Sequence, residues 1–209
     1  MLVGPDPRLN ELGRLVGALI AEPSPLPVRP PTRAALMLTL RLGLRALETC
    51  SLEWRAVDLD GAAPSITVTR SKTGAGLRAL PLARAAVEIL REFEGKFARR
   101  PAVSFPGRSR VEASETSASG SLSRAFARAC DYLGIADAST HDLRRTFLSG
   151  LIELGHESVA DRIAGHIPRH VMGRHYDRSK RLDAMRDGLE AWSAAVDAAA
   201  ARYAKEVGK

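Results

Sequence analysis

The sequence has little cysteine, no long hydrophobic run and no internal repeat. Its two cysteines, Cys50 and Cys130, form no CxxC or Cys/His spacing, which argues against a zinc site. Each lies in an apolar helical pattern, so we expect two reduced, buried thiols. No apolar run is long enough to span a membrane, and the first ten residues lack the hydrophobic core of a signal peptide. These absences predict a soluble cytoplasmic protein.

The composition is ordinary for a globular protein, apart from an excess of positive charge. The 209 residues are 45% hydrophobic and 26% charged, enough for one domain spanning 1–209 with its core at about 6–176. A net charge of +7 and a pI near 10.0 favour an anionic partner, most commonly nucleic acid. The alternative is a basic protein whose charge only keeps it in solution, and charge does not decide between the two.

Hydrophobic periodicity predicts an α+β fold that is mainly α-helical, with a small antiparallel β-hairpin at one edge. Apolar residues recur at helical spacing in most segments, whereas two short segments alternate as strands do. The polar segment 98–120 has the composition of a loop. The predicted helices are 7–21, a central one capped by Thr32 and ended by Gly43, a short one begun by Arg45, 83–97, 122–134, one capped by Thr140, 158–164 and 182–206; the predicted strands are 65–70 and 77–82.

The segment 141–176 carries side chains that suit a phosphate ester. His141 and Arg144 are three positions apart, which places both on one face of a helix. Basic donors on a shared face suit a phosphate, and Tyr176, if brought beside them, would be placed to attack it. Each residue also has a structural interpretation, because His141 could bond Asp142 and Tyr176 could be a surface aromatic residue.

Three further residues are candidates for the same site. Arg45 lies at a junction between apolar helices, where a buried guanidinium needs an anion. Glu48, three residues on, would be its structural partner, and a ligand phosphate its functional one. Lys72 lies at the tip of the predicted hairpin, which is usually a solvated position. His166 follows Gly165 and could merely cap a helix.

Five short motifs resemble, in order, those of the tyrosine recombinase (phage integrase) family. They are GLRALE (43–48), RSKTG (70–74), HDLRRTF (141–147), AGH (164–166) and RHYDRS (174–179). Singly these are weak signals, but their common order on the expected helix and hairpin contexts is specific. The resemblance is to the family's catalytic domain, covers nearly the whole chain, and is nearest in pattern to integrases of prophages and genomic islands.

The resemblance implies a site-specific recombinase that cleaves and rejoins DNA strands during DNA integration. In this family a tyrosine forms a 3′-phosphotyrosyl bond to DNA and releases a 5′-hydroxyl, which later reverses the reaction. Because the covalent bond conserves the energy of the cut strand, neither a metal nor a nucleotide cofactor is implied. The implied catalytic residues are Arg45, Lys72, His141, Arg144, His166 and Tyr176.

The chemistry assigns a role to each of these residue types. Arg45 and Arg144 would bind the scissile phosphate, whose transition state gains negative charge. The phenol of Tyr176 has an ordinary pKa of about 10 and needs nearby cations or a base, for which His141 is the better candidate. Lys72 would protonate the leaving 5′-oxygen as general acid.

The remaining histidines of the segment do not predict a metal centre. His166 would hydrogen-bond the phosphate in the transition state, and His175 would position the neighbouring tyrosine or contact DNA. With His170 they could suggest a metal cluster, but Pro168 and Gly173 interrupt a regular helical face. No acidic ligand lies among them, so we expect no metal.

The expected partner is double-stranded DNA, and the family implies self-association into tetramers. Family members usually carry an N-terminal DNA-binding domain, and nothing before Asp6 could form it, so we expect that domain to be absent. The helix 182–206 would either pack on its own core, which is slightly favoured, or dock on a neighbouring protomer. The alternatives to an active recombinase are a decayed or truncated integrase that only binds DNA, and a monomeric enzyme similar to type IB topoisomerases.

Overall fold

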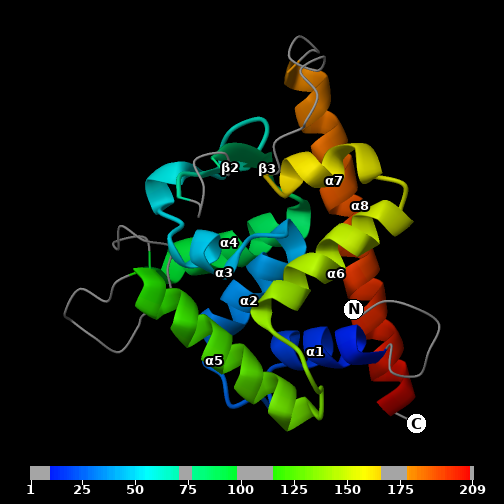
Figure 1. Ribbon diagram of the computed structural model, residues 1–209. Helices are drawn as coiled ribbons and strands as arrows, with labels where there is room; N and C mark the ends of the chain where they lie inside the picture. The colour runs from blue at the N-terminus through cyan, green and yellow to red at the C-terminus, as the bar shows by residue number, and fades with distance from the viewer. Residues whose placement is uncertain (1–9, 71–76, 98–114, 166–177, 208–209) are drawn as a thin grey trace.

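The computed structural model describes residues 10–70, 77–97, 115–165 and 178–207 (Figure 1). Helices pack around one another in these ranges and a small antiparallel sheet lies at one edge, which confirms the predicted fold class. The helices are α1 Asn10–Ile20, α2 Pro30–Leu42, α3 Ala46–Cys50, α4 Arg84–Phe97, α5 Glu115–Leu133, α6 Thr140–Glu153, α7 Glu157–Ile163 and α8 Arg178–Val207, with a 3₁₀ turn, η2, at Trp54–Ala56. The strands are β1 Val57–Asp58, β2 Ser65–Val68 and β3 Arg78–Pro81.

Helix α2 is the centre of the core and packs against α1, α3, α4, α5, α6 and α8. It is apolar on most sides, which suits a helix surrounded by others. It begins at Pro30, so the predicted cap at Thr32 is wrong. Prolines fit the first helical turn, where a backbone N–H has no intrahelical partner. The helix ends, as predicted, at Gly43, whose φ of 60° is left-handed.

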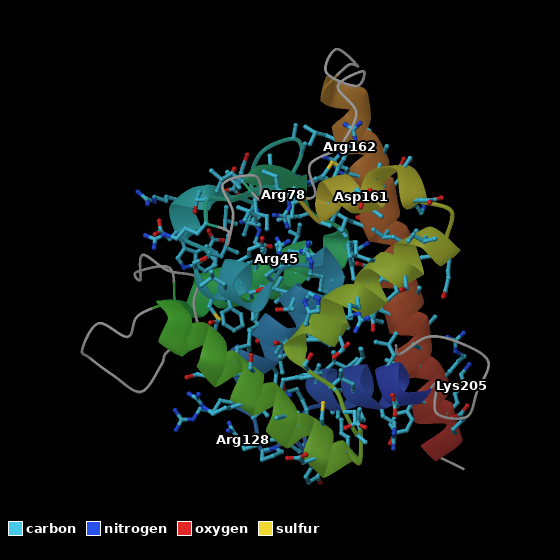
Figure 2. All side chains as sticks on the ribbon, in the orientation of Figure 1. Arg45, Arg78, Arg128, Asp161, Arg162 and Lys205 are labelled. Atoms are coloured by element: carbon cyan, nitrogen blue, oxygen red, sulfur yellow. The ribbon has the colours of Figure 1, made fainter. Side chains whose placement is uncertain are left out.

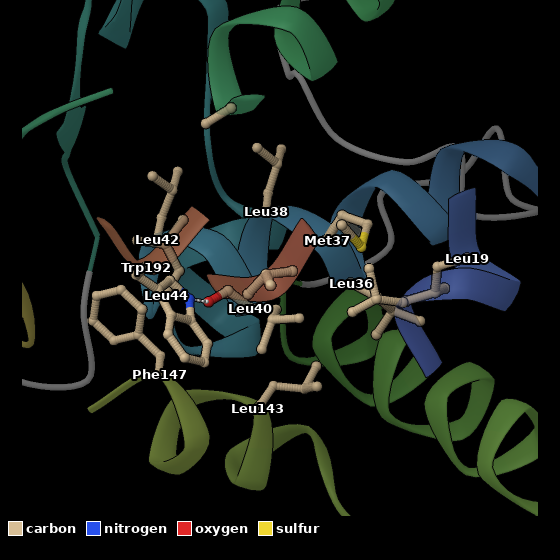
Figure 3. Packing of buried hydrophobic residues seen from close by; sticks show 14 of the residues in the cluster. Leu19, Leu36, Met37, Leu38, Leu40, Leu42, Leu44, Leu143, Phe147 and Trp192 are labelled. Carbon is tan, nitrogen blue, oxygen red and sulfur yellow. Dashed lines mark hydrogen bonds between the residues drawn. The ribbon is translucent and has the colours of Figure 1, made fainter. Parts of the chain in front are cut away.

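The C-terminal helix packs on the core of its own chain. Helix α8 packs against α1 and also contacts α2, α6, α7 and β3. Trp192 Nε1–H donates to the carbonyl oxygen of Leu40 at 2.9 Å, and its ring meets that of Phe147 edge to face with centroids 6.0 Å apart (Figure 3). Because Leu40 lies in the last turn of α2, this bond serves a carbonyl near the helix end. In this single chain α8 therefore packs in cis, the arrangement that the sequence slightly favoured.

The sheet has the order β1–β2–β3, with both pairs antiparallel. The β2–β3 pair was predicted, whereas β1 was not, because its two residues are too few to show an alternation. Across the β2–β3 pair, Ile66 faces Leu80 and Val68 faces Arg78. Ile66, Val68 and Leu80 are buried. Arg78 therefore belongs to the buried face of the sheet.

Two helices begin earlier than the sequence predicted. Helix α5 begins at Glu115, inside the predicted loop 98–120, because tertiary packing outweighs the weak helix propensity of serine and threonine. Ala118, in its first part, packs against the core. Helix α8 begins at Arg178, four residues before the predicted start at residue 182. Neither α8, at 30 residues, nor any other helix in the described ranges is apolar enough to cross a bilayer.

The N-terminus of α6 is capped one residue earlier than predicted. Ser139, not Thr140, is the capping residue, and its backbone N–H and hydroxyl both donate to Asp142 Oδ2, at 3.0 and 2.7 Å. These bonds satisfy the backbone N–H of the capping residue and hold the Asp142 carboxylate at the start of the helix. The cap fixes where α6 starts and therefore which helix face carries His141 and Arg144.

Both cysteines are free and buried, as predicted. Burial raises the pKa of Cys50 to about 12. Burial also raises the pKa of Cys130 to about 11, with the negative charges of Asp131 and Glu11 adding to the increase. The two thiols are therefore packing groups and not reactive thiolates.

Candidate active site

The junction between α2 and α3 places the first candidate residue. A side chain at Gly43 would put its Cβ 2.3 Å from the ring of Phe147, so the turn requires glycine. Arg45 follows as the N-terminal capping residue of α3. Its backbone N–H donates to Glu48 Oε2 at 3.0 Å, and its guanidinium donates to Oε1 at 2.8 Å. Arg45 thus has the structural partner that the sequence suggested, while 29% of its side chain stays exposed.

Arg144 reaches the same junction from α6. Its side chain is 3% exposed, and Nη1–H donates to the carbonyl oxygen of Gly43 at 2.5 Å while Nη2–H donates to that of Ala164. Glu48 Oε2 lies 3.8 Å from Nη1. Burial lowers the pKa of Arg144 to about 10; the positive charges of Arg45 and Arg78 lower it too, and Glu48 opposes them. A guanidinium held in such surroundings is stabilised by a nearby anion.

Arg78, at the start of β3, is a third arginine of this site, and sequence reasoning missed it. Its Nη1 and Nη2 groups donate to Glu48 Oε1 and Oε2 at 3.3 and 3.1 Å, and Nε–H donates to the carbonyl oxygen of Ile163 at 2.7 Å. A signal was present, because residues 78, 80 and 82 alternate on one strand face and Leu80 and Leu82 are buried. An arginine in phase with buried leucines requires a buried partner.

Glu48 is the carboxylate that joins the three arginines, and its side chain is fully buried. Burial alone would raise its pKa, but the bond and charge of Arg78 and the bonds from Arg45 outweigh burial and hold the pKa below the ordinary value. Glu48 is therefore an anion at neutral pH. Arg45, Arg78, Arg144 and Glu48, which we call the arginine cluster, carry three positive charges and one negative charge, a net charge of +2.

The arginine cluster unites parts of the chain that are distant in sequence. Figure 2 shows Arg45 and Arg78 near each other between the helices and the sheet, well apart from Arg128 on α5 and Lys205 near the C-terminus. The cluster draws on α3, β3 and α6, and its bonds reach the end of α7.

Within the described residues, no group of three or more histidine, cysteine, aspartate or glutamate side chains could hold a metal ion.

His141 lies on the first turn of α6 and its side chain is exposed. The neighbouring carboxylate of Asp142 accepts bonds from Ser139 and lies 3.4 Å from Arg145 Nη1. The carboxylate that was considered as a structural partner for His141 thus serves the helix cap. His141 is open to a ligand that approaches the start of α6.

The remaining predicted residues lie outside the described ranges. These are Lys72, His166 and Tyr176, together with His170 and His175. Their assignments stay predictions. Of the six implied catalytic residues, the described part of the structure brings together Arg45 and Arg144.

The model of the phage integrase family matches residues 8–181. The chain belongs to the phage integrase family. An integrase from mycobacterium phage Brujita has 22% sequence identity to this integrase-family chain and a TM-score of 0.59, with 86% of this chain and 56% of that chain covered. This likeness concerns the fold alone.

A lambda integrase dimer bound to a COC′ core site has 26% identity and a TM-score of 0.55, with coverage of 81% of this chain and 49% of that chain. This integrase-family chain therefore spans about half the length of the solved structures it matches. No curated protein matches it significantly.

Proposed function

We propose that this chain is a single tyrosine recombinase catalytic domain that cleaves and rejoins strands of double-stranded DNA. The observation that carries the proposal is the net charge of +2 on the arginine cluster. The side chain of Arg144 in this cluster is 3% exposed and that of Arg45 is 29% exposed. Among the described residues this cluster has more guanidinium groups than carboxylates, and a bound anion relieves the cost of holding such an excess of positive charge away from water. A DNA phosphodiester is an anion whose charge two guanidinium groups can bind in a fixed orientation.

The reaction consistent with this site is a transesterification. The phenolic oxygen of Tyr176 attacks the phosphorus, an O–P bond forms to the tyrosine, and the bond from phosphorus to the 5′-oxygen breaks. His141 accepts the phenolic proton and Lys72 donates a proton to the leaving 5′-oxygen. Attack by a 5′-hydroxyl on the phosphotyrosine reverses these steps and rejoins the strand.

The other proposed groups act on the phosphate. Arg45 and Arg144 neutralise the non-bridging oxygens, on which charge accumulates in the transition state, and His166 adds a hydrogen bond. The proposed activity also implies a cytoplasmic location, where DNA is accessible. Self-association on DNA is a further part of the proposal, because strand exchange requires more than one cleaved strand.

Trapping a covalent intermediate tests the proposal. The full chain is incubated with a pool of labelled duplexes of random sequence, each nicked so that cleavage releases a short 5′-hydroxyl fragment. Loss of that fragment prevents rejoining, and the covalent protein–DNA adduct then resists denaturation by detergent. Sequencing the attached strands identifies a preferred duplex for later kinetics.

Two phenylalanine variants decide the nucleophile. We expect Tyr176→Phe to form no adduct, whereas Tyr132→Phe, which changes an exposed tyrosine on α5, should form as much as the unmodified chain. An adduct that persists in Tyr176→Phe would show that another residue attacks. DNA binding without any adduct in the unmodified chain would favour a decayed integrase that acts only as a binding module.

A further inference from the structure

Arg78 is bound at both ends of its guanidinium group. Nη1 and Nη2 point to the two oxygens of Glu48, and Nε–H donates to the carbonyl of Ile163. The planar guanidinium makes these bonds in one fixed geometry, which a single ammonium group could not reproduce. With a side chain 9% exposed, Arg78 is held between α3 and α7.

Through its bonds to Glu48, Arg78 influences the orientation of the Arg45 side chain. The Glu48 carboxylate accepts bonds from both guanidinium groups and from the backbone N–H of Arg45. Orientation of this carboxylate by Arg78 therefore sets the direction in which the Arg45 guanidinium is held. Without Arg78, the carboxylate would keep its bonds to Arg45 but lose the bidentate support that fixes its plane.

On the α7 side, Arg78 and Arg144 hold two consecutive carbonyls. Arg78 binds that of Ile163, the last residue of α7, and Arg144 binds that of Ala164. Carbonyls at a helix C-terminus lack intrahelical partners, and cations are favourable there. Gly165 follows with a φ of 69°, and a Cβ at this position would lie 2.8 Å from Arg78 Nη1. Glycine thus permits both the left-handed turn and the close approach of Arg78.

We propose that Arg78 is a positioning residue of the strand-cleavage reaction, which orients Arg45 through Glu48 and fixes the end of α7 from which the chain continues to His166 and Tyr176. This inference rests on the proposed function, because it assigns Arg78 to the same reaction. Arg78 itself need not touch DNA. Its effect is to hold the phosphate-binding arginines and the end of α7 in one arrangement.

The test measures the single-turnover rate of adduct formation on the nicked duplex selected from the random pool. We expect Arg78→Gln to slow adduct formation about 100-fold, the size of loss that a displacement of about 1 Å causes. Affinity for the same duplex should change less than about threefold, because phosphate contacts elsewhere supply most DNA affinity. Arg78→Lys keeps the charge beside Glu48 but cannot make all the bonds of the guanidinium group, so we expect a loss of about 10-fold.

Arg33→Gln is the matched control. Arg33 is also buried, and it too donates to two carbonyls, those of Leu19 and Ala21, and to one carboxylate, that of Glu22. Both glutamine variants should lower the melting temperature, but Arg33→Gln should keep the adduct rate within about twofold of the unmodified chain. A general loss of stability would slow both variants alike and would overturn the positioning role.

The outcomes separate this inference from the proposed function. If the unmodified chain forms no adduct, or if Tyr176→Phe still forms one, the proposed reaction is wrong and the role of Arg78 in it is overturned too. The adduct could instead form and require Tyr176, while the folded Arg78→Lys and Arg78→Gln variants form it at the same rate as the unmodified chain. In that case only the role of Arg78 is overturned.

Discussion

Arg33 and Arg41, on the central helix, are about as deeply buried as Arg144 on α6, yet their carboxylate partners lie in solvent. Arg33 pairs with Glu22, which is 76% exposed, and Arg41 pairs with Asp197, which is 54% exposed. Each of these anchor arginines, Arg33 and Arg41, has one carboxylate for one guanidinium. Their remaining bonds go to backbone carbonyls at Leu19, Ala21 and Ser193.

The arginine cluster has the opposite arrangement. Three guanidinium groups share the fully buried carboxylate of Glu48, and 29% of the Arg45 side chain remains exposed. The difference teaches that a buried arginine does not by itself indicate a ligand. What indicates a ligand is an excess of guanidinium groups over carboxylates at a place that solvent still reaches.

The largest expected effect is on catalysis by Arg144. Arg144→Ala should reduce adduct formation about 1,000-fold or more, because it removes a charge that stabilises the developing oxyanion. General DNA binding, measured by a mobility shift at fixed salt, should be nearly unchanged, since one phosphate contact among many is lost. An equal loss of cleavage and binding would assign Arg144 to DNA binding. It would contradict the catalytic role that distinguishes Arg144 from the anchor arginines.

The next effect concerns the buried carboxylate. Glu48→Gln leaves three guanidinium groups without their shared anion, and we expect a loss of about 3 kcal/mol in the free energy of unfolding at pH 7. The folded-state pKa of Glu48 lies below its ordinary value of 4.5, so its contribution is present above about pH 4.5 and is lost as pH falls through the lower folded value.

Denaturant unfolding between pH 7 and pH 3 checks the prediction for Glu48. The difference in stability between the unmodified chain and Glu48→Gln should be constant at neutral pH and should narrow below about pH 4.5. A difference that stays the same down to pH 3 would mean that the Glu48 charge does not hold the cluster together.

A smaller effect is expected at the anchor arginine Arg41. Arg41→Met keeps the aliphatic volume but loses the ion pair with Asp197 and the bond to the carbonyl of Ser193, both on α8. We expect the free energy of unfolding to fall by about 1.5 kcal/mol, while the folded variant forms the adduct at the unmodified rate. Slower cleavage at unchanged stability would show that the attachment of α8 also affects the reaction.

The sequence predicted the helices and the hairpin because their apolar residues recur with the period of one structure only. It also identified Arg45 with Glu48, since an arginine at a junction between apolar helices needs a partner, and Arg144, since it shares a helix face with His141. It did not identify Arg78 as a member of the site. The alternation along β3 places Arg78 on the buried strand face, but its partners come from α3 and α7, and the strand sequence does not encode their approach.

Errors at element ends have the same origin. The last helix was predicted to begin at residue 182, yet α8 begins at Arg178. Pro30 and Glu115 likewise begin helices earlier than their local composition suggested. Local propensity is a weak guide where packing against distant residues stabilises the helix, and boundaries are where the two compete most evenly.

The smallest expected effect tests the excess charge of the arginine cluster directly, without DNA. Sulfate, a tetrahedral anion, should stabilise the folded chain by about 1.4 kcal/mol at ten times its dissociation constant, which corresponds to a rise of about 3 °C in melting temperature. The same ionic strength of chloride is the reference, and the rise should disappear in Arg45→Ala but persist in Arg33→Gln. A rise that persists in Arg45→Ala, or that is lost in Arg33→Gln, would place the anion elsewhere. It would also show that the two sets of arginines do not differ in the way that their carboxylates suggest.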